Sequence, residues 1–345
     1  MAATIGDVAE RAHVSTATVS RVLAGVGRAR PETEARVLAA ARELDYRPSG
    51  VARSLKRQTT ETLGLIVTDI ENPYFPELVR AVEDAARAEG YAILLCNAAD
   101  DPEREAGYLE LLVERRVDGL IIAASSLGAR HAEWLAAPPL PVVLVNTTAA
   151  DVDLPSIHSD NRAGSRLAAQ HLLDLGHRRF GYLMPPPRNV DGPVRLAGVR
   201  DALAEAGLDP ASIAIATGAP LVGGGEAAML ELLDRAPDVT AVLAYNDLMA
   251  IGALRAVRRR GSSVPEDVSV VGFDDVALAA YVDPPLTTLS QSTAEMGYWA
   301  VARLAERLRP RAGGNGSGSG QGSAPTVMLP VRLEVRGSTG PPRRG

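Results

Sequence analysis

TIGDVAERAHVSTATVSRVLAG, residues 4–25, decides the fold of the N-terminal part of this chain. Thr4 can cap a first helix whose apolar residues recur at helical spacing, and Ser15 can cap a second helix after a short break at His13. Pro31 suits the first position of a third helix. Three short helices with a tight turn between the first two predict a helix-turn-helix, which places its second helix in the major groove of DNA.

The second predicted helix carries, near its N-terminus, the side chains that can reach the floor of the groove. Thr16, Ala17 and Arg21 are the predicted base readers, and Ser15 and Thr18 suit phosphate contacts, which fix register without reading sequence. Arg21 can donate two parallel hydrogen bonds to guanine O6 and N7, whereas Ala17 offers only a methyl group. The alternative is that Arg21 is an ordinary solvated arginine.

Charge is divided unevenly along the 345-residue chain. Residues 1–60 hold ten Lys and Arg against six Asp and Glu, a net charge of +4, and the whole chain is at −6, so the remainder is at −10. A basic N-terminal part on an acidic body indicates that only the former meets a polyanion such as DNA. A net charge of +4 is also compatible with an ordinary solvated surface.

Residues 49–57, SGVARSLKR, can form one more short helix. A helix of this length is marginal in water, so we expect it to fold on DNA. Val51, Ala52 and Leu55 would form one apolar edge of that helix. The edge has two alternative roles: it packs on the rest of the protein, or a pair of Leu55 side chains enters the minor groove and kinks the duplex, with Lys56 beside it.

From residue 62 onward, near-continuous apolar runs alternate with amphipathic stretches. Such runs are typical of parallel strands covered on both faces, and their order predicts two successive doubly wound α/β units. Ligands of such units bind at the carboxyl ends of the strands. The predicted strands are 63–67, 91–97, 118–124, 141–146, 179–184, 240–247, 268–275 and a late strand in 327–337. Residues 313–324 are rich in Gly and Ser and predict a flexible loop.

The single cysteine and the absence of long apolar runs bear on where the protein acts. Cys96 lies inside the apolar run 91–97 and is predicted to be a core residue. No run approaches the roughly 18 apolar residues of a membrane span. The first residues, MAATIGDVAERA, lack the apolar region of a signal peptide. We therefore predict a cytoplasmic protein with no membrane partner.

Ten segments, in family order, resemble the LacI family of bacterial repressors. They are TIGDVAERAHVSTATVSRVLAG, PSGVARSLK, IENPYFPELVRAVEDAA, VDGLIIA, SDNRAGSRLAAQHLLDLGHRR, RLAGVRDAL, YNDLMAIGALRA, VSVVGFDD, PPLTTLSQ and RLEVRGST. The resemblance implies an all-α helix-turn-helix headpiece over residues 1–60, with a hinge helix over 49–57. It also implies a two-lobed α/β core over 62–340, similar to periplasmic sugar-binding proteins and built on doubly wound parallel sheets. The N-lobe would comprise 62–161 plus 291–323, and the C-lobe 162–290 plus 324–340.

The resemblance also implies a function. A homodimer would bind a palindromic operator at the nucleoid and repress carbohydrate-utilisation genes, with Thr16, Ala17 and Arg21 at the family's base-contacting positions. For the hinge, it favours insertion of Leu55 into the minor groove. A small molecule in the cleft between the lobes would control DNA binding allosterically, without cofactor, metal or enzymatic activity.

Polar side chains that follow predicted strands are the candidates for holding this effector. Asp160, Asn246 and Asp274 follow strands, and Arg195 lies where a loop enters a helix. Alternating carboxylate, amide and guanidinium groups suit vicinal hydroxyls, each of which both donates and accepts a hydrogen bond. By resemblance these four residues match effector-contacting positions of the family, and Tyr74 and Phe75 match an aromatic pair at the rim of the N-lobe. For Asp247 and Asp275, a helix cap or a contact between lobes is an equal alternative.

One departure from the family concerns the C-lobe, where many relatives carry an aromatic platform for a ring. Pro220 occupies that position here, and Val190 falls where a polar ligand contact occurs in the purine repressor. These departures disfavour a purine and leave the identity of any sugar open, and the resemblance to the family, in which sugar inducers are common, implies a sugar inducer as the effector. A co-repressor of nucleobase or other metabolism remains the alternative.

Two other classes of protein share a doubly wound core. An enzyme is disfavoured because the sequence has no G-x-G-x-x-G turn, no P-loop, no G-x-S-x-G elbow and only scattered histidines. A periplasmic solute-binding protein is disfavoured because it would carry a signal peptide in place of the helix-turn-helix.

Overall fold

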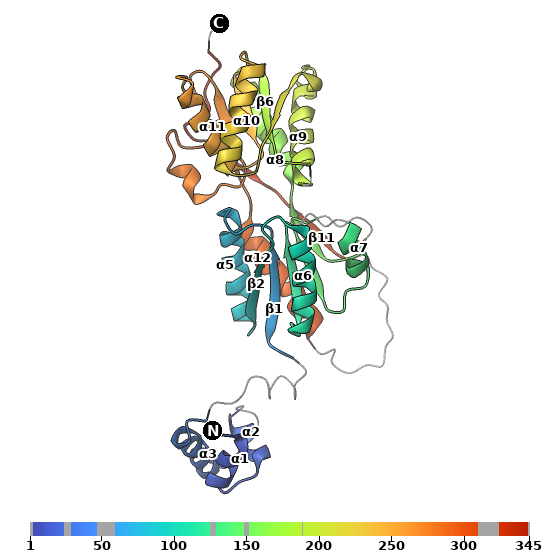
Figure 1. Cartoon of the computed structure of the whole chain (residues 1–345), viewed down its shortest axis with the longest axis vertical. Helices are drawn as coiled ribbons and strands as arrows, with labels where there is room; N and C mark the ends of the chain where they lie inside the picture. Colours follow the sequence, from blue (N-terminus) through green and yellow to red (C-terminus); the bar gives the residue numbers. More distant parts are fainter. Residues whose placement is uncertain are drawn as a thin grey trace. The chain divides into compact units, whose positions relative to one another are not determined.

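The computed structural model describes residues 3–23, 29–46, 59–124, 129–147, 152–187, 189–309 and 324–343. The described part of the N-terminal unit contains three helices. The helices are α1 (Ile5–Arg11), α2 (Thr16–Leu23) and α3 (Pro31–Glu43). The chain divides into this unit, up to Glu61, and a core unit from Thr62 onward. Figure 1 shows the elements of both.

The helix boundaries confirm the predicted caps. The Thr4 hydroxyl accepts a hydrogen bond from the Asp7 amide (3.3 Å) while the Asp7 carboxylate accepts one from the Thr4 amide (2.7 Å), a capping box that lowers the Asp7 pKa. The Ser15 hydroxyl accepts from the Thr18 amide at 3.2 Å, and Pro31 begins α3. The three helices share a small core, to which each contributes a fully buried valine: Val8, Val19 and Val37.

A six-stranded parallel sheet forms the N-lobe, in the order β11-β5-β4-β3-β1-β2. Its strands are β1 (Thr62–Val67), β2 (Ala92–Asn97), β3 (Gly119–Ala123), β4 (Val142–Val145), β5 (Ser156–Ser159) and β11 (Thr326–Leu329). The covering helices are α5 (Tyr74–Ala88), α6 (Pro102–Glu114), α7 (Ala129–Ala136) and α12 (Thr293–Leu308). The helices α5 and α12 pack together. The strands β3 and β4 are buried along their whole length and β1 is buried after its first residue, as expected for a parallel sheet covered on both faces.

A four-stranded parallel sheet forms the C-lobe, in the order β7-β6-β8-β9, and a short antiparallel pair, β10-β12, lies beside it. The strands are β6 (Phe180–Met184), β7 (Ala214–Thr217), β8 (Ala241–Ala244), β9 (Ser269–Val271), β10 (Thr288–Ser290) and β12 (Arg332–Glu334). The helices are α8 (Asn161–Asp174), α9 (Asp191–Glu205), α10 (Val222–Arg235) and α11 (Asp247–Arg259), with the short 3₁₀ turns η1 (Pro210–Ser212) and η2 (Ala277–Ala280). Helices pack in two pairs, α8 with α9 and α10 with α11 (Figure 1).

The chain crosses between the lobes three times: after β5, between β10 and α12, and between β11 and β12. The third crossing corrects the predicted C-lobe segment 324–340, which begins too early. Residues 326–329 pair with β5 in the N-lobe sheet, and only the chain after Pro330 belongs to the C-lobe. Proline has no amide hydrogen for a strand ladder, so it divides what the sequence suggested was one late strand.

The other predicted strands are all present, and Cys96 is buried as predicted, which raises the pKa of its thiol. The sequence did not predict β5, β7 or β10, which have at most four residues each, with polar residues at their ends or centres. Among the described residues, none of the helices is long and apolar enough to cross a membrane.

Candidate effector site and DNA-reading helix

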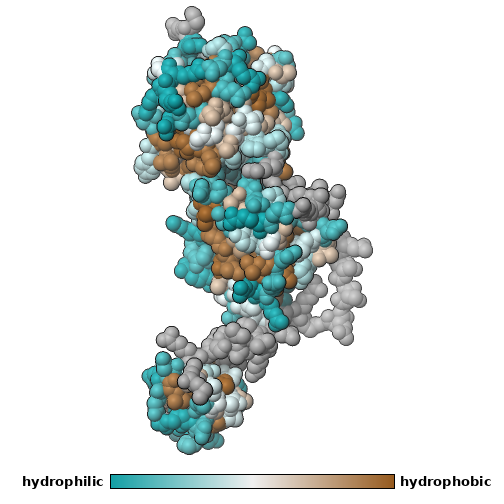
Figure 2. Space-filling model, viewed as in Figure 1, coloured by the Kyte–Doolittle hydropathy of each residue, from teal (hydrophilic) through white to brown (hydrophobic). Residues whose placement is uncertain are grey.

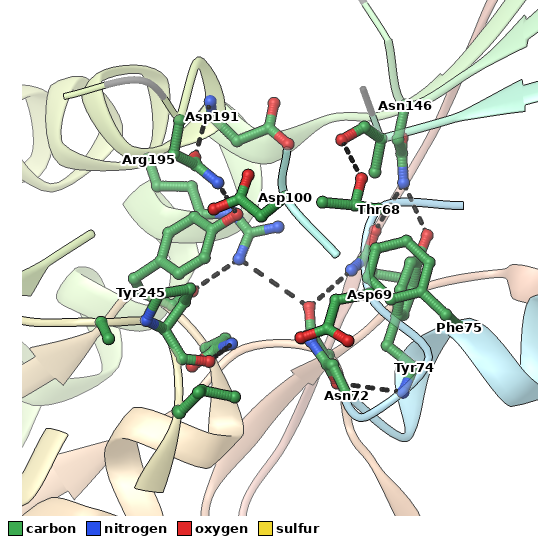
Figure 3. Close-up of a pocket in the computed structure, with 18 of the residues that line it drawn as sticks. Thr68, Asp69, Asn72, Tyr74, Phe75, Asp100, Asn146, Asp191, Arg195 and Tyr245 are labelled. Atoms are coloured by element: carbon green, nitrogen blue, oxygen red, sulfur yellow. Dashed lines mark hydrogen bonds and ion pairs between the residues drawn. The ribbon is translucent and has the colours of Figure 1, made fainter. Parts of the chain in front are cut away.

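A cavity of about 220 Å³ lies between the two lobes of the core, and we call it the interlobe cavity. Loops that follow β1, β2, β3 and β4 supply its N-lobe wall, and loops that follow β6, β7, β8 and β9 supply its C-lobe wall. Its polar lining residues are Thr68, Asp69, Asn72, Asp100, Asn146, Asn189, Asp191, Arg195, Asn246, Asp274 and Gln291. The cavity thus opens at the carboxyl ends of both sheets, where the fold predicts a ligand (Figure 3).

The structure brings five of the six predicted effector residues to this cavity: Tyr74, Phe75, Arg195, Asn246 and Asp274. Asp160 lies elsewhere. Its carboxylate accepts a hydrogen bond from the Ala163 amide at 2.9 Å and caps α8, so its position after a strand reflects a helix cap.

Arg195 is the most enclosed charged group of the interlobe cavity, with only 4% of its surface exposed. Its Nε donates to the Asn161 side-chain oxygen (2.9 Å) and its Nη1 to the Tyr245 carbonyl (2.5 Å). The guanidinium carbon lies 3.5 Å from the centre of the Phe273 ring and 4.6 Å from that of Tyr245, so two rings hold its plane. These contacts hold the guanidinium in a fixed position at the wall of the cavity.

The Asp274 carboxylate faces Arg195, with Oδ1 3.8 Å from Nη1. Its Oδ1 accepts a hydrogen bond from Gln291 Nε2 at 2.8 Å. Burial raises the pKa of Asp274 to about 6, against the opposing effects of Arg195 and of hydrogen bonds from Asn72 and Gln291. The residue has a φ of 118°, which L side chains rarely adopt, and such strained positions concentrate at functional sites.

Asn246 lies at the same wall, but its side-chain amide already makes hydrogen bonds within the C-lobe. Its Oδ1 accepts from the Met249 amide (2.9 Å) as the cap of α11, and its Nδ2 donates to the Pro220 carbonyl (3.1 Å). Pro220 and Leu221 form an apolar part of the lining, at the position where many relatives carry an aromatic platform. Because both polar ends of Asn246 are engaged, it offers a ligand only its remaining acceptor and donor capacity.

The aromatic pair belongs to the opposite wall. The Tyr74 and Phe75 rings meet edge to face, with centroids 5.2 Å apart at 81°. The Tyr74 hydroxyl accepts from Asn146 Nδ2 at 2.7 Å, and burial raises its pKa. The wall that this pair builds is therefore rigid and largely apolar.

Neither Asp247 nor Asp275 lines the interlobe cavity, and neither makes the helix cap or the contact between lobes that the sequence offered as the alternative. Asp247 is fully buried, and its carboxylate accepts from the Val276 amide at 2.8 Å and from the Thr288 hydroxyl. Asp275 pairs with Arg336 at 2.6 Å. Both residues join separate segments of the C-lobe.

The buried carboxyls predict how stability changes with pH. Burial, with the nearby Asp274 adding to it, raises the Asp247 pKa to about 7. An unfolded aspartate has a pKa of about 3.9, so between roughly pH 4 and 7 the folded core binds more protons than the unfolded chain. The stability contributed by these protons is complete below about pH 4 and is lost as the pH rises through the folded pKa values of about 6 and about 7.

We therefore expect Asp247 and Asp274 to lower the melting temperature of the core as the pH is raised from about 5 to about 8, while the lowered pKa values of His158, His171 and His177 act in the opposite direction at the acidic end of this range. In the Asp247→Asn variant the amide can still accept from Val276 and donate to Thr288, so its melting temperature should fall less steeply. Asp209→Asn, an exposed cap of η1, is the matched control and should keep the wild-type slope. Equal slopes in all three proteins, measured by differential scanning fluorimetry, would contradict the assignment.

Several cavity residues were not predicted from the sequence: Asn72, Asp100, Asn146, Asn189, Asp191, Tyr245 and Gln291. Asn146 and Asp100 closely follow predicted strands, so the rule that selected Asn246 applied to them as well. Asn189 was not predictable from its neighbours in the sequence, because its side-chain amide donates to the hydroxyl of Tyr245, a residue distant in the chain, at 2.7 Å.

The helix-turn-helix unit presents its predicted readers on the surface of α2. Thr16, Ala17 and Arg21 are exposed, while Val19 between them faces the small core. The hydroxyls of Ser15 and Thr18 lie 3.0 Å apart at the start of the helix. The predicted hinge residues Ala52, Leu55 and Lys56 lie outside the described residues.

Comparison with known proteins decides the family. Residues 4–49 match the family described as "Bacterial regulatory proteins, lacI family", and residues 169–339 match the "Periplasmic binding protein-like domain". The HTH-type transcriptional repressor PurR of Mannheimia succiniciproducens is 39% identical over 89% of this chain and 92% of its own length. The chain belongs to the LacI family. It is a DNA-binding transcriptional repressor.

Solved structures extend the family assignment to the whole fold of this LacI-family repressor. A lac repressor dimer bound to operator and the anti-inducer ONPF is 29% identical, with a TM-score of 0.86 over 99% of this chain and 100% of that one. A complex of the transcriptional regulator CelR with cellobiose is 32% identical, with a TM-score of 0.71 over 97% of this chain and 99% of that one. Both confirm the predicted combination of helix-turn-helix and two-lobed α/β core.

Proposed function

We propose that this LacI-family repressor binds a palindromic operator as a homodimer and is induced by an uncharged sugar held in the interlobe cavity. Arg195, Asn246 and Asp274 would hold the sugar hydroxyls, and Tyr74 and Phe75 would pack against its apolar face. Thr16, Ala17 and Arg21 would read bases, Ser15 and Thr18 would contact phosphates, and the hinge with Ala52, Leu55 and Lys56 would occupy the minor groove. The protein would act at the nucleoid in the cytoplasm and catalyse no reaction.

The observation that carries this proposal is the position of Arg195 and Asp274. A buried guanidinium donor and a buried carboxylate acceptor face each other at 3.8 Å in a cavity with aromatic walls. A sugar presents neighbouring hydroxyls that both donate and accept, together with apolar C–H faces, so it suits this combination. The cellobiose complex of the related CelR regulator supports a sugar as the ligand class.

The charges that line the interlobe cavity favour an uncharged ligand over an anionic one. Four lining residues are aspartates, Asp69, Asp100, Asp191 and Asp274, and among the described lining residues Arg195 is the one cation. A phosphate ester placed here would meet carboxylates on several sides, and its one cationic partner is already held by neighbouring groups. The free sugar should therefore bind more tightly than its phosphate.

A nucleobase or nucleoside acting as co-repressor is the second candidate. Tyr74, Phe75 and Tyr245 place three aromatic rings at the cavity wall, and a flat base can stack on such rings.

A thermal-shift screen of the full chain against pentoses, hexoses, their phosphates, nucleobases and nucleosides tests the proposal. A ligand at 100 times its dissociation constant stabilises the protein by about 2.7 kcal/mol, so a sugar that binds should raise the melting temperature by several degrees. Asp274→Ala should abolish the shift, whereas Asp234→Ala, at an exposed ion pair on α10, should retain it. A shift with sugar phosphates alone would contradict the uncharged ligand, and one with nucleobases alone would favour the second candidate.

A further inference from the structure

We propose that Gln291 is the positioning residue that fixes the angle between the two lobes of the core and links this angle to the interlobe cavity. Gln291 lies in the second crossing, between β10 and α12, and only 7% of its surface is exposed. The link to the cavity rests on the proposed function, because it concerns a residue proposed to hold the ligand. The control of the angle does not depend on any ligand.

The two ends of the Gln291 amide contact opposite lobes. On the C-lobe side, Nε2 donates to Asp274 Oδ1 at 2.8 Å. On the N-lobe side, Oε1 accepts from the Ser159 hydroxyl at 2.6 Å and from Asn146 Nδ2 at 3.1 Å. Since the ionised Asp274 carboxylate can only accept and the Asn146 amide nitrogen can only donate, the Gln291 amide has one orientation that satisfies all three bonds.

The N-lobe partners are themselves fixed. Asn146 Oδ1 accepts from the Ser159 amide at 2.8 Å, which ties the end of β4 to the end of β5. Asn146 Nδ2 also donates to the Tyr74 hydroxyl at the start of α5. A shift of Gln291 would therefore break its bonds to two N-lobe residues, Asn146 and Ser159, which are also bonded to each other. A buried and fully satisfied network of this kind has discrete geometries and does not deform gradually.

The other two crossings do not bridge the lobes in this way. In the first crossing, the Asp160 side chain caps α8 within the C-lobe. In the third, Pro330 and Val331 carry no polar side-chain group, and Val331 packs against Gly164 of α8. Within the described crossings, Gln291 is therefore the residue whose side chain joins polar groups of both lobes. Asn72, which follows β1 and lies in no crossing, also bonds to Asp274, so Gln291 is one of two N-lobe-linked donors to this carboxylate.

The bond to Asp274 connects this joint to the interlobe cavity. A ligand hydroxyl that donates to Asp274 Oδ1 from the side on which Gln291 Nε2 lies would compete with that amide for the same lone pair. Occupation of the cavity would then weaken the joint and alter the angle between the lobes. A ligand can shift such an equilibrium only through a difference in its contacts between the two angles, and this competition supplies one.

The test measures the distance between spin labels on the two lobes of the full chain, with neither ligand nor DNA present. Ala88→Cys on α5 and Ala227→Cys on α10 place labels at exposed positions, and Cys96→Ala removes the buried thiol. Dilution with a large excess of unlabelled chain restricts the signal to distances within one protomer. In this background, native Gln291 should give a single narrow distance distribution.

Two variants remove the bonds in different ways. Gln291→Met keeps the length of the side chain without its hydrogen bonds, and it should broaden the distribution or add a second distance. Gln291→Glu places a carboxylate against Asp274 and should broaden it near pH 8. Near pH 5 the protonated glutamic acid can donate again, so the narrow distribution should return. The background protein, measured at both pH values, corrects for titration of Asp274, Asp247 and Asp191.

Gln170→Met on α8, where the native amide donates to Asp174, is the matched control and should leave the distribution unchanged. An unchanged distribution in Gln291→Met would overturn the proposal, and so would a broadened Gln291→Glu distribution that does not respond to acid. If Gln291→Met fails to fold, the acid response of Gln291→Glu decides alone. A failed ligand screen would leave this result intact, so the two proposals fail separately.

Discussion

Arg195→Ala is expected to lower the free energy of unfolding of the core by about 3–5 kcal/mol and to abolish the response to the effector. The substitution removes a buried cation and leaves the Asp274 carboxylate without its ionic partner. It also leaves a gap between the Phe273 and Tyr245 rings, which the guanidinium now fills. Denaturant titration of the purified protein, followed by circular dichroism, measures the loss.

Two further variants make this result interpretable. Arg195→Lys keeps the charge without the planar fork, so it should recover only part of the stability. Arg166→Ala removes an exposed ion pair with Glu205 at 3.1 Å and should cost less than about 1 kcal/mol. The loss in Arg195→Ala should also be smaller near pH 5, where Asp274 is largely protonated. An Arg195→Ala variant as stable as Arg166→Ala would show that the buried pair does not stabilise the core.

Arg21→Ala is expected to weaken discrimination between operator and altered operator by about 2–6 kcal/mol. A bidentate contact from arginine to guanine contributes about 1–3 kcal/mol, and a homodimer would make it once in each half-site. Arg21 is exposed on α2, so its loss should leave the melting temperature unchanged. The measurement requires a duplex selected from a random library by the full chain, followed by fluorescence anisotropy on that duplex and on versions with each guanine replaced.

Arg11→Ala is the matched control, because Arg11 belongs to the same small unit but pairs with Glu43 at 2.7 Å. This variant should keep the discrimination of the native protein. If Arg21→Ala weakened binding to all duplexes equally and only reduced its salt dependence, Arg21 would be a phosphate contact and not a base reader.

The sequence predicted the helical unit well because its signals are local. A cap at Thr4, a cap at Ser15 and a proline at the start of α3 each act within one turn of the helix that they define. The long apolar strands were equally clear. The strand Ser156–Ser159 was not, since its pattern is short and polar, and its place in the sheet depends on two neighbours distant in the chain.

The interlobe cavity was predictable only in part. The rule that ligands bind at the carboxyl ends of parallel strands selected Asn246 and Asp274, but also Asp160, which caps a helix instead. A cap and a ligand contact use the same residue types after a strand, so sequence alone cannot separate them. The role of Gln291 is more remote still, because its partners Asn146 and Asp274 come from different sheets.

The edge strand β11 sets an order of events during synthesis of the chain. The three described helices, and Tyr46 that packs on their shared core, have been synthesised by residue 46, whereas the N-lobe sheet receives its last strand only with residues 326–329. The 280 residues between positions 46 and 326 take roughly 14–56 s to translate at about 5–20 residues per second. Throughout that interval the nascent chain contains the helix α2, whereas the N-lobe sheet of the effector-binding core is still incomplete. A messenger cut short before residue 326 would therefore encode the helix-turn-helix unit without a complete effector-binding core.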